Sequence, residues 1–112
     1  MSSPAKKAPF YDLAEIQTRF ASGDGTQYVI THRASDEARQ TLGFSEPQIK
    51  ACIAQLTVAK DFYKPMPAKH PKAKAKGLWQ DVYRTDYDGT KVYLKLQLTA
   101  EGVAVLVNCK RK

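Results

Sequence analysis

Strict alternation of apolar and polar residues near the end of the chain predicts a β-hairpin. In residues 91–98, aliphatic side chains alternate with a phenol, an ammonium and an amide, and this period of two is typical of a strand with one buried face. The preceding Asp88-Gly89 pair favours a type I′ turn, because both central residues of that turn need positive φ. The sequence therefore predicts a partner strand over residues 79–84.

A two-residue turn fixes which residues of the two strands lie opposite each other. Arg84 then lies opposite Tyr93, and Val82 lies opposite Lys95; directly opposed residues share a face of the sheet. One predicted face carries Gln80, Arg84, Tyr93 and Lys95, and the other carries Trp79, Tyr83, Leu94 and Leu96. An amide, a guanidinium, a phenol and an ammonium without a carboxylate suit a polyanion, although a merely solvated sheet face predicts the same alternation. Asp81 falls on the apolar face unless the strand bulges there.

A last strand is predicted over residues 103–110. Apolar side chains fall on both of its faces, so we expect it to be buried on both sides. A short turn would pair Tyr93 with Lys110, whereas a four-residue turn would pair Tyr93 with Asn108. Either register adds Asn108 and Lys110 to the face that holds Tyr93.

Helical periodicity predicts that helices and one short strand make up the N-terminal half. The first helix begins at Asp12, with Glu15 at the capping-box position, and ends at a Gly-Asp-Gly segment. A strand over residues 26–31 follows. The next helix is predicted to be capped by Ser35 and to end at Gly43. The core face of the first helix consists of Leu13, Ile16 and Phe20.

The third helix has the clearest start signal in the chain. Ser45 is the expected N-cap, Pro47 lies in the first turn and Gln48 occupies the capping-box position. Its amphipathic core face consists of Ile49, Cys52, Ile53 and Leu56.

Four lysines crowd into a short segment between the third helix and the hairpin. They are Lys69, Lys72, Lys74 and Lys76. Pro65 and Pro67, which precede them, favour an extended or turning chain. Pro71 and the small residues between the lysines predict a solvated, mobile loop. Such a loop can still deliver positive charge to a polyanion.

Positive charge is concentrated in the C-terminal half. Residues 1–56 carry six basic and six acidic side chains, whereas residues 57–112 carry twelve basic and five acidic ones and so hold the whole net charge of +7. This asymmetry favours nucleic acid, an anionic membrane or an acidic protein as the partner. At 112 residues, we expect one domain over residues 1–112, with a flexible tail over residues 1–9.

Other classes of protein are disfavoured by what the sequence lacks. No apolar run approaches the roughly 20 residues that span a bilayer, and the N-terminus lacks the apolar core of a signal peptide, so we expect a cytoplasmic protein without membrane association. Cys52 and Cys109 are predicted to be free thiols in a reducing compartment. Together with the two histidines they fit no compact zinc spacing, so we expect no metal and no cofactor.

RNA can be cut without a metal when its own 2′-hydroxyl attacks the neighbouring phosphorus. This reaction needs a base for the hydroxyl proton, cations for the phosphorane charge and an acid for the 5′-oxygen. Lysine and tyrosine can transfer these protons if neighbouring charge and burial displace their pKa values towards neutrality. The candidate site consists of Gln80, Arg84, Tyr93, Lys95 and Lys110, with Lys64 near it. These residue types alone do not separate RNA cleavage from RNA binding.

Three motifs, followed by a basic C-terminus, resemble the MqsR family. They are Asp61-Phe62-Tyr63-Lys64-x-Met66, Trp79-Gln80-Asp81-Val82-Tyr83-Arg84 and Val92-Tyr93-Leu94-Lys95. MqsR proteins are toxins of type II toxin–antitoxin systems, namely mRNA interferases with a RelE-like fold. The resemblance is strong over residues 61–112, and before that only the order of elements agrees. It implies an α+β, RelE-like fold, with N-terminal helices packed on a mainly antiparallel sheet that ends in a three-stranded meander.

The resemblance also implies roles for particular residues. Lys64, Gln80 and Tyr93 match family residues associated with cleavage, and Lys110 matches a family lysine near the C-terminus. We expect RNA to be bound by Arg84, Lys95, Lys110, Lys69, Lys72, Lys74 and Lys76. The implied partners are mRNA and a cognate antitoxin that binds zinc and DNA. The segment between Met66 and Trp79 is longer and richer in lysine than the family pattern.

We therefore predict a metal-independent endoribonuclease that cleaves single-stranded mRNA and so inhibits translation and growth. The alternative is a non-catalytic RNA- or DNA-binding module. It would use the same basic face and would stack bases on Tyr83 or Trp79. Discrete cuts that survive a chelator separate the first function from the second.

Overall fold

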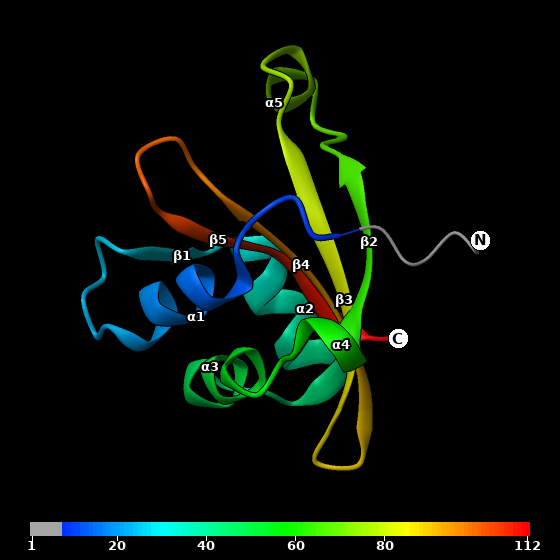
Figure 1. Cartoon of the computed structure of the whole chain (residues 1–112). Helices are drawn as coiled ribbons and strands as arrows, with labels where there is room; N and C mark the ends of the chain where they lie inside the picture. Colours follow the sequence, from blue (N-terminus) through cyan, green and yellow to red (C-terminus); the bar gives the residue numbers. More distant parts are fainter. Residues whose placement is uncertain (1–7) are drawn as a thin grey trace, which may run out of the picture.

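The computed structural model describes residues 8–112 and has an α+β architecture (Figure 1). Its elements are α1 (Leu13–Ala21), β1 (Tyr28–Ile30), α2 (His32–Leu42), α3 (Glu46–Ala54), α4 (Val58–Asp61), β2 (Phe62–Pro67), α5 (Pro71–Ala75), β3 (Trp79–Tyr87), β4 (Thr90–Leu98) and β5 (Ala104–Arg111). One five-stranded sheet has the order β1-β5-β4-β3-β2 and is antiparallel except where β1 lies beside β5. The predicted α+β, RelE-like fold is thereby confirmed, and β3, β4 and β5 form its meander. Residues 1–7 of the predicted tail lie outside the described residues.

The hydrophobic core lies between one face of the sheet and helices α1, α2 and α3 (Figure 1). The predicted helical stripes are all buried there: Leu13, Ile16 and Phe20 from α1, and Ile49, Cys52, Ile53 and Leu56 at α3. Leu94, Leu96 and Leu106 meet them from the sheet and are fully buried. Because burying each such side chain stabilises a fold by about 1.5–3 kcal/mol, these stripes determine which face of the sheet the helices cover.

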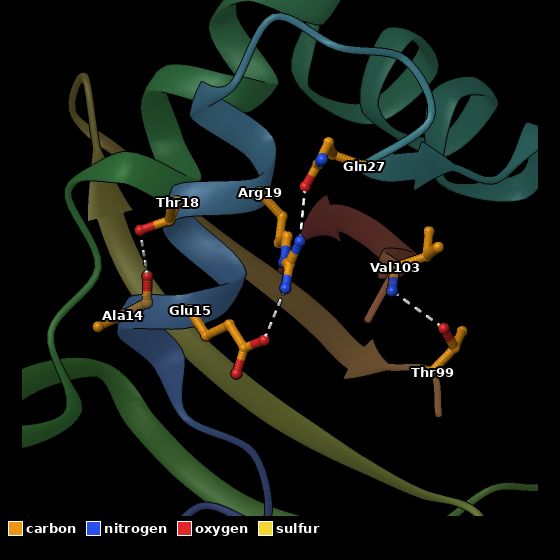
Figure 2. Close-up of polar contacts among 7 residues, drawn as sticks. All are labelled: Ala14, Glu15, Thr18, Arg19, Gln27, Thr99 and Val103. Carbon is orange, nitrogen blue, oxygen red and sulfur yellow. Dashed lines mark hydrogen bonds and ion pairs between the residues drawn. The ribbon is translucent and has the colours of Figure 1, made fainter. Parts of the chain in front are cut away.

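The start of α1 differs from its prediction in one respect. The Asp12 carboxylate caps the helix by accepting the Ala14 N–H at 3.0 Å, as expected. Glu15, however, binds Arg19 on the next turn at 3.0 Å instead of completing a capping box. Arg19 also donates to the Gln27 side chain at 2.7 Å (Figure 2). One guanidinium therefore ties α1 to the segment that leads into β1.

Helix α2 begins three residues before the predicted cap. Thr31, not Ser35, is the N-cap, and its hydroxyl accepts the Ala34 N–H at 3.1 Å. The same hydroxyl donates to the Leu106 carbonyl at 3.0 Å. Thr31 can do both because it directly follows β1, so one side chain ends the strand and starts the helix. Gly43 ends α2, as predicted, and it has the left-handed conformation.

The hairpin between β3 and β4 has the predicted register. Arg84 lies opposite Tyr93, and Asp88 and Gly89 have φ values of 52° and 78°. Strand β5 then pairs Tyr93 with Lys110, which was the first of the two alternatives. A bulge between Lys95 and Leu96 on this pairing adjusts the register toward the turn. The side chains on both faces of β5 are at least half-buried up to residue 107, as the sequence predicted.

The lysine segment was predicted to be a loop, and this prediction is wrong for its central part. Residues Pro71–Ala75 form α5, which begins at Pro71 behind the cap residue His70. The Ala68 N–H donates to the Leu78 carbonyl at 2.9 Å, so the segment is closed at its base. Pro71 favours this start because its fixed φ and missing N–H suit the first turn of a helix.

Strand β2 contains two prolines and is an edge strand of the sheet, where a residue without an N–H group is tolerated.

Asp81 lies on the helix-covered face, opposite Leu96 and without a bulge. It is fully buried, and its carboxylate accepts the N–H groups of Phe10 and Tyr11, each at 2.9 Å. Burial raises the pKa of the Asp81 carboxyl group, and the two hydrogen bonds from the backbone N–H groups oppose that rise. The same N-terminal segment covers Trp79, whose half-buried indole stacks on Phe10 with 5.7 Å between ring centroids. A buried carboxylate thus fastens the N-terminal segment across β3.

Candidate nucleic-acid interface

The pairing of four strands brings the predicted site residues together on the face opposite the helices. We call this surface the polar face and define it as Lys64, Gln80, Arg84, Tyr93, Lys95 and Lys110. One row across the sheet contains Arg84, Tyr93 and Lys110, and the next contains Lys64, Val82, Lys95 and Asn108. Gln80 extends the surface and donates to the Gln97 side chain at 3.1 Å. Residues separated by up to 46 positions in sequence therefore share one surface.

Positive charge on the polar face is not neutralised by neighbouring carboxylates. Among residues 8–112, no ion pair includes Lys64, Arg84, Lys95 or Lys110. The nearby Glu37 accepts two hydrogen bonds from the Asn108 side chain, at 3.0 and 3.1 Å. Asn108, which was expected on this face, is therefore already engaged. The cations remain available to a ligand with negative charge.

Tyr93 occupies the middle of the polar face, between Arg84 and Lys110. It is half-buried, and the Lys110 Nζ lies 5.5 Å from its ring centroid. Proton transfer was expected to need a pKa displaced towards neutrality, but burial raises the pKa of Tyr93 and outweighs the opposing effect of Arg84. The phenol therefore stays protonated at neutral pH. It is suited to donate a hydrogen bond or a proton rather than to accept one.

Lys95 shows the opposite response to the same surroundings. Only 9% of the residue is exposed, and burial lowers the pKa of its ammonium. The charges of Lys69, Lys110 and Arg33 lower this pKa further, while Glu37 opposes them. An unpaired, poorly solvated ammonium gains from an anionic ligand, because the ligand replaces both its lost hydration and its missing counter-charge.

Lys64 reaches the polar face by way of a bulge in β2. The strand pairs Phe62 with Tyr83 and Lys64 with Val82, which leaves Tyr63 without a partner in the register. Phe62 is buried in the core, whereas Tyr63 and Lys64 are exposed. The extra residue lets the strand bury Phe62 and still present two consecutive side chains to solvent.

Tyr83 and Trp79 lie on the predicted apolar face, so neither is placed to stack bases as the alternative function required. Tyr83 is fully buried against Phe62, and Trp79 lies on the helix-covered side beneath Phe10. Neither residue is on the polar face. Tyr63 is the exposed aromatic residue beside that face, and periodicity missed it because the bulge interrupts the alternation of β2.

The lysines around α5 extend the positive surface past one end of β2 and β3 (Figure 1). Lys69, Lys72, Lys74 and Lys76 are all exposed. Lys69 differs from the others because it lies close enough to Lys95 to lower the pKa of that residue. The segment therefore adds one lysine to the edge of the polar face and carries the rest further out.

Comparison with models of protein families identifies the family of the chain. Residues 8–111 match the model of the family described as "Motility quorum-sensing regulator, toxin of MqsA". The chain belongs to the MqsR toxin family. No curated protein matches it in sequence. The match covers the N-terminal half as well, where the MqsR resemblance rested only on the order of elements.

Membership of the MqsR family gives the polar face its context. MqsR proteins are toxins of toxin–antitoxin systems and in general ribonucleases. No helix among residues 8–112 is long and apolar enough to cross a membrane. The same residues contain no group of three histidine, cysteine or acidic side chains placed to hold a metal ion.

Proposed function

We propose that the chain is the toxin of a type II toxin–antitoxin system and a metal-independent endoribonuclease that cleaves single-stranded mRNA in the cytoplasm. The observation that carries this proposal is the polar face, where a protonated phenol, an amide and four basic side chains converge, none of them in an ion pair among residues 8–112. Membership of the MqsR family supports it independently. Cleavage of mRNA would inhibit translation and growth.

In the proposed reaction, the 2′-oxygen attacks phosphorus and the bond to the 5′-oxygen breaks. Tyr93 gives its proton to the leaving 5′-oxygen, because its raised pKa keeps the phenol protonated. The neutral amine form of Lys64 takes the proton of the 2′-hydroxyl and becomes an ammonium. Gln80, whose amide is oriented by Gln97, positions the scissile group. The products are a 2′,3′-cyclic phosphate and a 5′-hydroxyl.

Binding of RNA is assigned to the cations around these groups. Lys95, Arg84 and Lys110 neutralise the charge of the phosphorane, which is most effective where solvent is partly excluded. Lys69, Lys72, Lys74 and Lys76 attract the rest of the strand by charge. The proposed antitoxin partner is an MqsA-like protein that binds zinc and DNA.

The test is incubation of a poorly structured mRNA with the purified protein in the presence and absence of EDTA. Discrete cuts that survive EDTA and carry cyclic phosphate ends are expected. Tyr93→Phe serves as the control for a contaminating nuclease, which this substitution would not affect. RNA that is retarded in a gel but stays intact would contradict the proposal and favour a nucleic-acid-binding module.

A further inference from the structure

Tyr63 is an exposed aromatic residue whose position the proposed chemistry does not explain. It is 41% exposed, whereas its neighbour Phe62 is 2% exposed. The bulge in β2 creates this contrast, because Tyr63 is the residue left out of the pairing with β3. β-Bulges are frequent beside functional sites, where they redirect a side chain.

Arg84 forms the second half of the arrangement. The centre of its guanidinium lies 3.5 Å from the centroid of the Tyr63 ring. Within residues 8–112, the buried Arg84 Nε has no hydrogen-bond partner, and no ion pair includes this side chain. A buried donor without a partner is costly in the free protein and is expected where a ligand supplies the acceptor.

The pair directly adjoins the proposed catalytic phenol. Arg84 lies opposite Tyr93 in the register of β3 and β4. Tyr63 and Arg84 both lie close enough to Tyr93 to influence its pKa, in opposite directions. A group bound on Tyr63 would therefore be a near neighbour of the phosphate that the proposed reaction cleaves.

We propose that Tyr63, backed by the Arg84 guanidinium, is a stacking platform for the nucleobase next to the scissile phosphate. The unpartnered Arg84 Nε then donates to an oxygen of that nucleotide. This inference rests on the proposed function for its RNA substrate and identifies how one nucleotide is held. Aromatic rings and arginine planes both bind unpaired bases by stacking, and every base offers a π-face, so the platform suits a single strand and not a duplex.

Binding is measured with a short unstructured RNA that carries 2′-fluoro sugars and so cannot be cut. Tyr63→Leu should weaken binding about 10-fold to 100-fold, the range typical of one stacked base. Tyr63→Phe keeps the ring and should bind like the parent protein. Phe10→Leu removes another exposed aromatic ring, from the helix-covered side, and should not change affinity. Melting temperatures of all variants show whether each one is folded.

A second arm removes the base instead of the ring. An abasic site placed in turn at each position of the same RNA should weaken binding to the parent protein at one position. At that position, the abasic site should have little effect on RNA binding by Tyr63→Leu, because two changes that delete the same contact are not additive. Equal affinities of the parent and of folded Tyr63→Leu would overturn the platform, as would additive losses at every position.

The binding experiment also separates this inference from the proposed function. If the parent protein binds the uncleavable RNA with the expected dependence on Tyr63 but never cuts natural mRNA, the platform stands and the ribonuclease proposal fails. If the parent protein cuts mRNA and Tyr63→Leu binds equally well, only the platform fails. Absence of any RNA binding by the parent protein would overturn both.

Discussion

Tyr93 and Lys95 lie two residues apart on β4, and partial burial acts on them in opposite directions. Burial disfavours the charged form of each side chain, so it raises the pKa of the phenol and lowers the pKa of the ammonium. The charge of Arg84 opposes the effect on Tyr93, whereas the charges of Lys69, Lys110 and Arg33 reinforce the effect on Lys95. Tyr93 is therefore suited to act as an acid, and Lys95 is an ammonium without an ion pair among residues 8–112.

Removing the Tyr93 hydroxyl tests its role as the acid. Tyr93→Phe should slow RNA cleavage by about 10²–10⁴-fold, because the 5′-oxygen then leaves without a proton. RNA affinity and melting temperature should remain close to those of the parent protein. Tyr87→Phe, on the helix-covered face of the same hairpin, is the matched control and should cleave normally. Parental cleavage by Tyr93→Phe would exclude the hydroxyl from the reaction.

Lys64→Ala extends this test to the second proton transfer. It should also impair single-turnover cleavage, and the double variant should lose less than the product of the two single losses if both groups act as one unit.

Lys95 should stabilise the RNA complex and destabilise the free protein. Its folded-state pKa lies below the ordinary value of 10.5, so folding disfavours the charged form. Lys95→Met should therefore raise the melting temperature of the free protein below the lowered pKa. This gain should shrink as the pH rises through that pKa towards 10.5, because the parent lysine loses its proton there. RNA affinity should fall. The slope of log affinity against log salt should decrease by the amount expected for the loss of about one phosphate contact.

Thermal melts over a pH series and RNA titrations over a salt series provide these measurements. Lys91→Met, at an exposed lysine of the same strand, is the matched control. A Lys95→Met variant that is less stable than the parent protein at neutral pH would contradict the argument from burial.

At the scale of elements, α2 completes the edge of the sheet that β1 leaves open. Strand β1 pairs with β5 only as far as Leu106. Beyond it, Glu37 accepts the Cys109 N–H at 3.3 Å and Thr41 accepts the Arg111 N–H at 2.9 Å. An open strand edge would invite pairing with another chain, and the side chains of α2 prevent this. They also fix the C-terminal end of β5, which carries Lys110.

The lysines around α5 are expected to attract RNA without taking part in the chemistry. Replacing Lys69, Lys72, Lys74 and Lys76 with glutamine should weaken RNA binding and reduce the slope of log affinity against log salt by up to about 0.7 per lysine. Cleavage at saturating RNA should change little. Lys69→Gln alone is the informative comparison, because only this lysine lies near enough to affect Lys95. A large loss of turnover at saturation in the fourfold variant would place the segment within the active site.

At the scale of the whole molecule, both halves of the chain contribute to one hydrophobic core, although the net positive charge lies in residues 57–112. Cys52 on α3 and Cys109 on β5 lie in the same hydrophobic cluster and are fully buried free thiols. Burial raises the pKa of each thiol to about 12. Neither thiol is therefore a thiolate at neutral pH, and a reagent reaches either one only after the helices separate from the sheet.

Thiol labelling should therefore report opening of the core. In native buffer at neutral pH, both cysteines should react with a disulfide reagent far more slowly than a free thiol, and they should react at the same rate. Denaturant should accelerate both together, because a core shared by helices and sheet opens as one unit. Rapid labelling of Cys109 alone would show that β5 detaches separately from α3, and a Cys52→Ala variant identifies which thiol reacts.

The sequence by itself determined the features that depend on neighbouring residues. The Asp88-Gly89 turn fixes the register of β3 and β4, because a turn of two residues leaves only one way to pair the strands. Periods of two and 3.6 residues identify the buried faces, since both follow from local backbone geometry. The motifs around Lys64, Gln80 and Tyr93 also sufficed to recognise the family, because they lie within short segments of the chain.

Only the tertiary structure decided what depends on segments that are distant in sequence. Asp81 is buried beside amides contributed some seventy residues earlier, and Thr31 rather than Ser35 starts α2 because β5 lies next to it. The bulge that exposes Tyr63 arises because Phe62 must reach a core that other elements build. The pKa of Tyr93 rises rather than falls because desolvation depends on everything packed around a group. Local patterns carry no information about that enclosure, and it is the enclosure that sets the chemistry of the polar face.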